Sequence, residues 1–168
     1  LSIPVQFGGG VRNESDLDEI LGGGASRVVI GTAAFRDPEF LKKAVEQYSD
    51  RIVVGLDARD GLLATHGWNQ VEKVEALTFA KSLVQMGVER VVYTDISRDG
   101  MMSGPNWMVT EQLAQETGLK VIASGGVSSL EDLRVLKPLG RSGVEGVIVG
   151  KALYEEKFSL RDAIRISL

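Results

Sequence analysis

Short, mostly apolar runs alternate along this chain with longer segments of helical spacing. The runs cover residues 3–7, 27–30, 51–56, 90–93, 121–123 and 147–149. Runs that are apolar on both faces are typical of strands in a parallel sheet that helices cover. The segments between them predict helices over residues 15–21, 40–48, 71–86, 107–116 and 159–166, and one that begins at Leu130. The pattern therefore predicts about six βα units.

Capping residues support the predicted helix boundaries. Before the predicted helix 40–48, Asp37 is a suitable N-cap and Pro38 fits the first helical position. Gly118 ends the predicted helix 107–116. Ser128 or Ser129 is available as the cap before Leu130. Two polar segments, residues 58–69 and 94–106, follow the third and fourth strands and predict loops at the end of the sheet.

Two distant parts of the chain carry the same pattern. Residues 9–11, Gly-Gly-Val, overlay on residues 125–127, and residues 30–33 then fall on residues 149–152 after a small insertion. A two-strand repeat over about 3–48 and 120–166 is what a barrel with twofold internal symmetry would show. We expect one domain, 1–168, of the (β/α)8 TIM-barrel class within α/β proteins, with about six parallel βα units forming a partial barrel.

Composition narrows the possible functions. The net charge is −4 and no dense Lys/Arg block occurs, so a nucleic-acid partner is not expected. No apolar run approaches the roughly 20 residues of a membrane span, so no membrane partner is expected either. The absence of cysteine excludes disulfides and thiolate metal sites, and it fits a cytoplasmic protein.

Glycines gather where the predicted strands end and helices begin. Such a junction offers free backbone N–H groups and the positive end of a helix dipole, which suits a phosphate. The alternative is an ordinary turn, but four occurrences in two matched pairs favour binding. The candidate phosphate-binding residues are Gly9, Gly10, Gly31 and Thr32 in the first cradle, and Ser124, Gly125, Gly126, Gly150 and Lys151 in the second.

Several polar or aromatic residues at the same strand ends allow two interpretations. Asp57 directly follows an apolar strand, which favours catalysis or substrate binding, although aspartate also caps helices and turns. Asp95 either points into the barrel or caps the following turn. Trp68 either packs a loop against the barrel or stacks on a planar ligand. Lys151 either contacts phosphate or lies outside the barrel, and His66, the sole histidine, fits a surface position.

The motifs together resemble one enzyme family, the phosphoribosylformimino-5-aminoimidazole carboxamide ribotide isomerases of histidine biosynthesis. The resemblance covers the whole chain. It is carried by residues 6–12 (QFGGGVR), 28–33 (VVIGTA), 54–57 (VGLD), 67–68 (GW), 94–100 (TDISRDG), 124–127 (SGGV) and 146–153 (GVIVGKAL). The cyclase subunit of imidazole glycerol phosphate synthase shares the fold and the twin phosphate sites, but residues 31–32, 67–68 and 149–151 are more similar to the isomerase.

The resemblance implies an Amadori rearrangement of an aminoaldose to an aminoketose. A general acid protonates the ring oxygen of the ribose, and a general base removes the proton at C2′, with no metal and no cofactor. It further implies a small bis-phosphorylated ribotide as substrate, for which phosphate or sulfate ions could substitute. The residues implied are Asp99 as the acid, Asp57 as a second active-site carboxyl group, Thr94 as a supporting hydroxyl, and Arg12 and Trp68 as substrate contacts.

The chain also departs from the family. Leu1 corresponds to a point just before the family's third strand, so the first two βα units, with the aspartate that serves as the base, have no counterpart here. We expect the isolated chain to have negligible isomerase activity. We also expect a homo-oligomer formed through exposed barrel edges. The alternatives are a bifunctional isomerase that also accepts phosphoribosylanthranilate, and a phosphate-binding or structural assembly module without catalysis.

Overall fold

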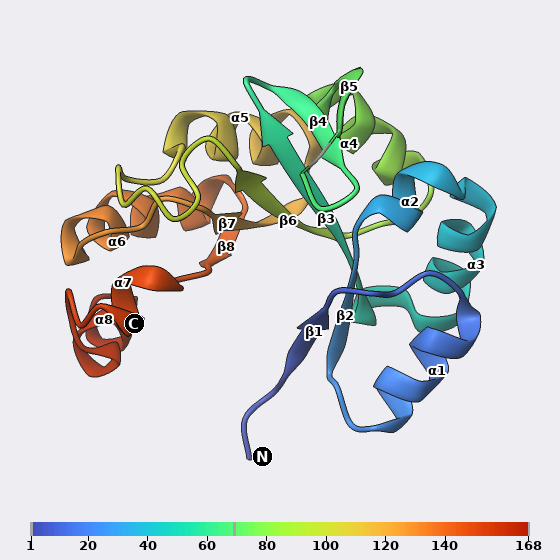
Figure 1. Cartoon of the computed structure of the whole chain (residues 1–168), viewed down its shortest axis with the longest axis horizontal. Coiled ribbons are helices and arrows are strands. Elements are labelled where there is room, and N and C mark those ends of the chain that lie inside the picture. Colours follow the sequence, from blue (N-terminus) through green and yellow to red (C-terminus); the bar gives the residue numbers. More distant parts are fainter. Residues whose placement is uncertain (1, 69, 168) are drawn as a thin grey trace.

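Six parallel strands form the centre of the computed structural model, which describes residues 2–68 and 70–167 (Figure 1). They lie side by side in the order in which they follow one another along the chain, and every pair is parallel. The strands are β1 (Gln6–Gly8), β2 (Arg27–Ile30), β3 (Ile52–Arg59), β6 (Arg90–Asp95), β7 (Lys120–Ser124) and β8 (Val144–Val147). The sheet curves like part of a barrel wall, with helices on its convex side. The predicted class, a partial (β/α)8 barrel, is confirmed.

The helices follow the strands, and most of them begin and end where capping residues predict. Asp37 accepts a hydrogen bond from the N–H of Phe40, with Pro38 at the first helical position, and Gly118 ends its helix at φ +73°. The helices are α1 (Glu14–Gly22), α2 (Thr32–Arg36), α3 (Pro38–Tyr48), α4 (Ala76–Gln85), α5 (Trp107–Thr117), α6 (Leu130–Leu136), α7 (Lys151–Tyr154) and α8 (Leu160–Ser167), with 3-10 turns at Ser49–Arg51 and Lys137–Ser142.

A β-hairpin replaces part of the loop and helix that the sequence predicted after β3. Strand β3 continues to Arg59, turns at Asp60 and Gly61, and pairs with β4 (Leu62–Thr65), which pairs in turn with β5 (Gln70–Glu75). The predicted helix 71–86 is therefore wrong at its start, because residues 70–75 are a strand and α4 begins at Ala76. From Val71 onwards, side chains of β5 alternate between exposed and partly buried positions, as in a two-stranded ribbon at the surface.

The first and last predicted strands have different bounds in the structure. Strand β1 begins at Gln6 rather than at Ile3, whose side chain is exposed. Strand β8 spans Val144–Val147 rather than 147–149. The apolar residues after β8 have another cause, because Val147 and Val149 pack with Val127, Leu133 and Ala163 between the end of the sheet and α6 and α8. Val147 and Val149 are therefore apolar because they pack against these helices, although the strand ends at Val147.

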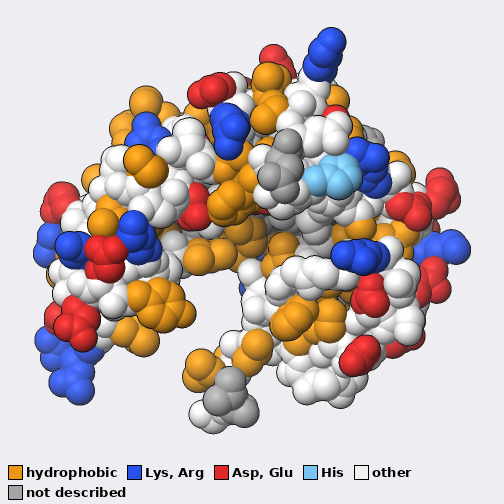
Figure 2. Space-filling model, in the orientation of Figure 1, with side chains coloured by type: hydrophobic (Ala, Val, Ile, Leu, Met, Phe, Trp, Pro, Cys, Tyr) orange, Lys and Arg blue, Asp and Glu red, His pale blue; other side chains and the backbone are white. Residues whose placement is uncertain are grey.

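The main core lies between the sheet and its helices. It includes the fully buried side chains of Leu17 in α1, Leu41 in α3, Leu83 in α4 and Leu113 in α5. On the concave side of the sheet, Val53, Val92 and Ile122 from three neighbouring strands form a smaller cluster. This side is hollowed and open between β1 and the α7–α8 end (Figure 2). Strand ends therefore project residues into an accessible cavity.

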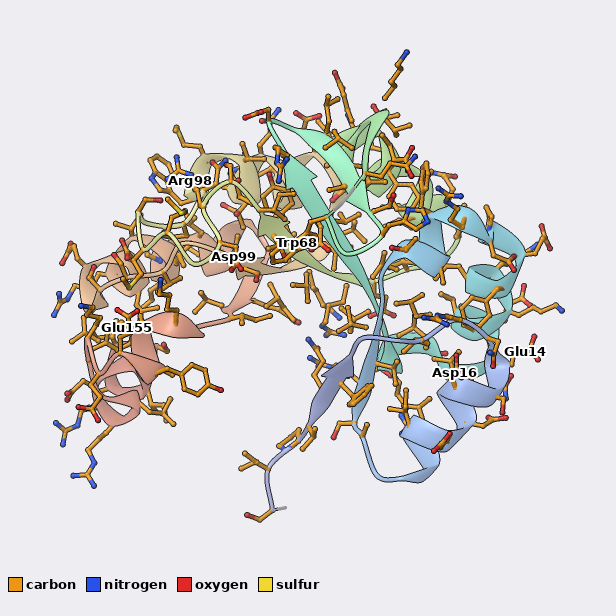
Figure 3. The ribbon with its side chains drawn as sticks, in the orientation of Figure 1. Glu14, Asp16, Trp68, Arg98, Asp99 and Glu155 are labelled. Carbon is orange, nitrogen blue, oxygen red and sulfur yellow. The ribbon has the colours of Figure 1, made fainter. Side chains whose placement is uncertain are left out.

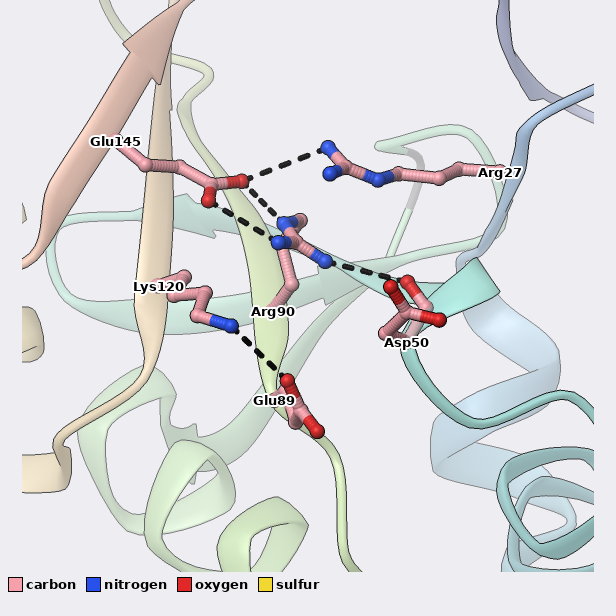
Figure 4. A network of polar contacts seen from close by, with 6 residues as sticks. All are labelled: Arg27, Asp50, Glu89, Arg90, Lys120 and Glu145. Atoms are coloured by element: carbon pink, nitrogen blue, oxygen red, sulfur yellow. Dashed lines mark hydrogen bonds and ion pairs between the residues drawn. The ribbon is translucent and has the colours of Figure 1, made fainter.

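A polar network joins the strands at their amino ends (Figure 4). Arg90, on β6 and almost fully buried, forms a two-pronged ion pair with Glu145 on β8 and donates a hydrogen bond to the backbone oxygen of Asp50. Arg27 on β2 lies 3.7 Å from the same glutamate. Because Glu145 contacts side chains of β2 and β6, the network ties one end of the sheet to the other across its concave side.

Candidate active site

The carboxyl ends of β3 and β6 place two predicted site residues side by side. Asp57 and Thr94 are paired in the register of these strands. Thr94 is buried next to Asp57, and its side chain lowers the pKa of the Asp57 carboxyl group. The carboxyl ends of the strands form the ligand-binding face of barrel enzymes. Asp57 therefore lies where a ligand can reach it and is not an N-cap.

Burial controls the charge of Asp57. Desolvation raises the pKa of this carboxyl group above its ordinary value, and the nearby negative charge of Asp99 raises it further. Hydrogen bonds from Trp68 and Thr94 counteract part of the rise because they stabilise the carboxylate. The indole Nε1 of Trp68 donates to Oδ2 of Asp57 over 2.9 Å. The raised pKa suits a group that exchanges protons with a substrate.

A large cavity lies on the concave side, between the first glycine cradle and the ends of the central strands. Its volume is about 850 Å³. From the predicted site it gathers Gly9, Gly10, Arg12, Gly31, Thr32, Asp57, Thr94 and Ser124. His66 and Gly67, which precede Trp68 in the hairpin loop, also line it. Residues far apart in the sequence therefore share one cavity.

The backbone of the first cradle depends on glycine. Gly9 and Gly10 have φ values of +110° and +77°, which side chains disfavour, and open space lies where their side chains would be. After them, Asn13 caps α1 in a capping box with Asp16, whose carboxylate also accepts the N–H of Arg12. Gly31 precedes α2 with φ −93° and ψ −113°. The backbone at Gly9, Gly10 and Gly31 is thus open to the cavity.

A smaller cavity of about 170 Å³ lies beside the second cradle. From the predicted site it gathers Asp99, Ser124, Gly125, Gly126, Gly150 and Lys151. Ser124 and Ile148 line both cavities, so the two are neighbours. Asp99 and Trp68 both appear at the upper rim of the concave side in Figure 3, and each acts on the Asp57 carboxylate, Trp68 by a hydrogen bond and Asp99 by its charge. A carboxyl group thus stands at the wall of each cavity.

The second cradle resembles the first in its backbone. Gly125 and Gly126 have φ values of +91° and +85°, and Gly150 precedes α7 with φ −107° and ψ −96°. Ser129, rather than Ser128, caps α6 in a capping box with Asp132, as Asn13 does with Asp16 at α1. The proposal of a two-strand internal repeat gains support from these matched angles and caps.

The structure shows what Lys151 and Trp68 contact, for which the sequence allowed two alternatives each. The Nζ atom of Lys151 donates to the backbone oxygen of Gly100 over 3.0 Å, so it lines the cavity while tying α7 to the loop that carries Asp99. Trp68 follows His66 and Gly67 in a loop where all three residues have positive φ. The N–H of His66 donates to the Thr32 hydroxyl over 3.0 Å. The hairpin loop therefore contacts both the first cradle and Asp57.

Sequence reasoning missed how the polar groups around Asp95 hold the loop that carries Asp99. Asp95 accepts hydrogen bonds from Ser97 and Asn106, so it caps the following turn and does not point into a cavity. Aspartate side chains often accept a hydrogen bond from the backbone N–H two residues later, and this tendency favours the capping alternative. The hydrogen bond between Asn106 and Asp95 could not be predicted from the sequence, because the two residues are eleven positions apart.

The family described as "Histidine biosynthesis protein" matches residues 1–159. The chain belongs to this family. In Geobacillus kaustophilus (strain HTA426), a relative named 1-(5-phosphoribosyl)-5-((5-phosphoribosylamino)methylideneamino) imidazole-4-carboxamide isomerase is 48% identical over 166 residues, 99% of this chain and 68% of the relative. The isomerase of the same name in Bacillus subtilis (strain 168) is 46% identical over 98% of this chain and 67% of the relative.

A third relative of the same name, in Desulforudis audaxviator (strain MP104C), is 50% identical over 99% of the chain and 63% of its own length. This member of the histidine biosynthesis family thus spans about two thirds of the relatives that it matches. The expected resemblance to the isomerases of the pathway is confirmed.

Over residues 2–68 and 70–167, no three His, Asp or Glu side chains gather in a way that could hold a metal ion. Within the same residues, every helix is too short or too polar to cross a membrane. The expectation that catalysis needs no cofactor stays a prediction.

Proposed function

We propose that this chain carries the active-site face of a histidine-pathway isomerase that converts a bis-phosphorylated aminoaldose ribotide to the aminoketose. One observation carries the proposal: two glycine-lined cavities adjoin through Ser124 and Ile148, and each has a carboxyl group at its wall. An elongated substrate with a phosphate at each end fits such a pair. The names of the relatives support the same reaction.

The two cradles bind the phosphates in this proposal. The first offers the backbone of Gly9, Gly10 and Gly31 with the Thr32 hydroxyl, and Arg12 adds a positive charge at the same cavity. The second offers the backbone of Gly125, Gly126 and Gly150 with the Lys151 ammonium group. With both phosphates bound, the reacting ribose is held between the two cradles, and this binding orients it for the reaction.

The carboxyl groups at the two cavities act on the sugar in this proposal. Asp99 protonates the ring oxygen and opens the ribose, and Asp57, supported by Thr94, is the second carboxyl group that contacts the opened sugar. The raised pKa of Asp57 fits this role because a group with a pKa nearer neutrality gives and takes protons more readily. Trp68, whose indole N–H contacts Asp57, can stack on the planar imidazole of the substrate.

Turnover of the purified 168-residue chain tests the proposal together with the expectation of negligible activity. The ribotide is supplied, and formation of the aminoketose is followed alongside binding by calorimetry. The proposal predicts tight, saturable binding that Asp99→Asn leaves in place, while any turnover falls by about 10²–10⁴-fold. Asp37→Asn, outside both cavities, is the matched control. Absence of ribotide binding would contradict the proposal.

The same assay with phosphoribosylanthranilate tests the bifunctional alternative, because that substrate undergoes the same rearrangement. Turnover of both substrates would support it. Phosphate binding without turnover, and without rescue by an added segment that carries the aspartate expected as the base, would support the non-catalytic module instead. A cytoplasmic location remains a prediction.

We further infer that the protein forms a homo-oligomer through the exposed edges of its sheet. Within the described residues, β1 and β8 each have one strand neighbour. Exposed apolar side chains flank both edges, Ile3 and Phe7 at one and Ile148, Tyr154 and Ile164 at the other. Unpaired edges and apolar patches of this kind favour association.

A further inference from the structure

Asp95 is a buried charged residue to which the reaction assigns no task. It is the last residue of β6 and is only 6% exposed. Its carboxylate accepts hydrogen bonds from the N–H and hydroxyl of Ser97 and, over 2.7 Å, from Nδ2 of Asn106. Nε of Arg98 lies 3.7 Å away. These partners stand at both ends of the loop 96–106, so one carboxylate closes the loop.

The charge of Asp95 strengthens these contacts. Burial alone raises the pKa of the carboxyl group, but the hydrogen bonds from Ser97 and Asn106 and the positive charge of Arg98 outweigh it and bring the pKa below its ordinary value. The group is therefore ionised at neutral pH. Hydrogen bonds to an ionised acceptor are about twice as strong as neutral ones.

The closed loop lies directly against the second cradle. A side chain on Gly125 would come within 2.7 Å of the Asp95 backbone oxygen, and one on Gly126 within 2.4 Å of the Gly104 oxygen. The N–H of Gly104 donates to the oxygen of Gly126 over 2.9 Å. These two glycines are thus required by the approach of the loop, whatever ligand the cradle binds.

The same turn places Asp99. The N–H groups of Arg98 and Asp99 both donate to the backbone oxygen of Asp95 over 3.1 Å. Lys151 fixes the next residue from the other side through its bond to the oxygen of Gly100. The position of Asp99 above the second cradle therefore depends on the turn that begins at Asp95.

We propose that Asp95 is a positioning residue, whose carboxylate holds the loop 96–106 against Gly125 and Gly126 and so keeps Asp99 and the second phosphate cradle in one arrangement. The proposal rests on the proposed function, because the roles of Asp99 and of the cradle come from it. It adds that loop and cradle form one unit, whereas the first cradle is independent of Asp95.

Phosphate titration of the ¹⁵N-labelled 168-residue chain tests this, with inorganic phosphate as the probe. Amide shifts of Gly125, Gly126 and Gly150 report the second cradle, and those of Gly9 and Gly10 report the first. Asp95→Asn keeps the shape of the side chain but replaces one acceptor oxygen by an amide donor. We expect at least a tenfold weaker affinity at the second cradle and an unchanged affinity at the first.

Hydrogen exchange gives a readout that needs no phosphate. The amides of Arg98, Asp99 and Gly104 should lose protection at least tenfold in Asp95→Asn, while amides of α3 keep theirs. The control is Asp37→Ala, which removes the cap of α3 and lowers stability without touching the loop. It should leave both phosphate affinities and the loop amides as in the wild type.

The outcomes separate the two proposals. If the wild-type chain binds phosphate at neither cradle, the proposed phosphate sites are wrong, and the exchange experiment still decides the role of Asp95. If Asp95→Asn leaves the loop amides protected, or weakens both cradles equally, or does no more than Asp37→Ala, Asp95 is a contributor to stability only and the positioning role is overturned.

Discussion

At the scale of single residues, Asp57 combines a functional position with a cost in stability. Its folded pKa is raised by burial, so the ionised form is less favourable in the folded protein than in the unfolded chain. We expect Asp57→Asn to be more stable than the wild type at pH 7. The difference should shrink as the pH falls through the folded pKa and vanish below about 3.9, the unfolded value. Urea unfolding between pH 3 and pH 8 measures it.

A second variant checks that the pH-dependent difference in stability comes from the raised pKa of Asp57. Trp68→Phe keeps an aromatic ring but removes the indole N–H that stabilises the Asp57 carboxylate. In the Trp68→Phe background, the folded pKa of Asp57 should therefore rise further, so the gain in stability from Asp57→Asn at pH 7 should be larger and should begin to shrink at a higher pH. A stability difference that is the same at every pH would contradict the assignment to Asp57.

Of the residues at the strand ends, Asp57 could be placed from the sequence, whereas the reason for Gly126 could not. Asp57 could be placed at the cavity because an apolar run stops directly before it, and its pairing with Thr94 follows from parallel register. The reason for glycine at position 126 could not be predicted, because it depends on the Gly104 oxygen, which arrives from another loop. A glycine motif indicates close approach without showing what approaches.

At the scale of elements, the two matched capping boxes determine where α1 and α6 begin. In each, an N-cap side chain accepts the N–H of an aspartate three residues later, and that aspartate accepts the N-cap N–H. Asn13→Ala and Ser129→Ala should each lower the free energy of unfolding by about 1 kcal/mol. Asn13→Ser should restore most of it. Chemical denaturation measures both, and equal stability of Asn13→Ala and wild type would contradict the role of the cap.

The antiparallel ribbon β3–β4–β5 is the part of the fold that sequence patterning missed. Asp60 and Gly61, both at positive φ, form the two-residue turn between β3 and β4, and an Asp-Gly pair is a hairpin signal that the sequence contains. Strand β5 is harder to predict because residues 70–75 contain glutamate and lysine beside valine, which also fit an exposed helix. The strand forms because β4 offers its edge, a tertiary effect that local propensity does not contain.

At the scale of the whole molecule, the network at the amino ends of the strands should hold the curvature of the sheet. Arg90 is almost fully buried, so removing Glu145 leaves an unpaired charge in the interior. We expect Glu145→Leu to cost about 2–3 kcal/mol, less than a wholly buried pair would, because Glu145 is partly exposed. The double variant Arg90→Met with Glu145→Leu should recover most of the loss. A double-mutant cycle by thermal unfolding measures the coupling, and additive losses would contradict it.

The open edges of the sheet lead to the last prediction, on association. Tyr154 is 89% exposed and Ile164 49% exposed at the α7–α8 end, and Ile3 is 67% exposed beside β1. Burial of such side chains contributes a favourable free energy of about 25 cal/mol per Å² of apolar surface, which favours contact between copies of the chain. Analytical ultracentrifugation at about 10–100 µM, roughly the range of moderate dissociation constants, should show a dimer or larger assembly. Tyr154→Lys with Ile164→Lys should shift it towards monomer, whereas Val135→Lys, at an exposed apolar position on α6, should not. A monodisperse wild-type monomer would show that these edges do not associate.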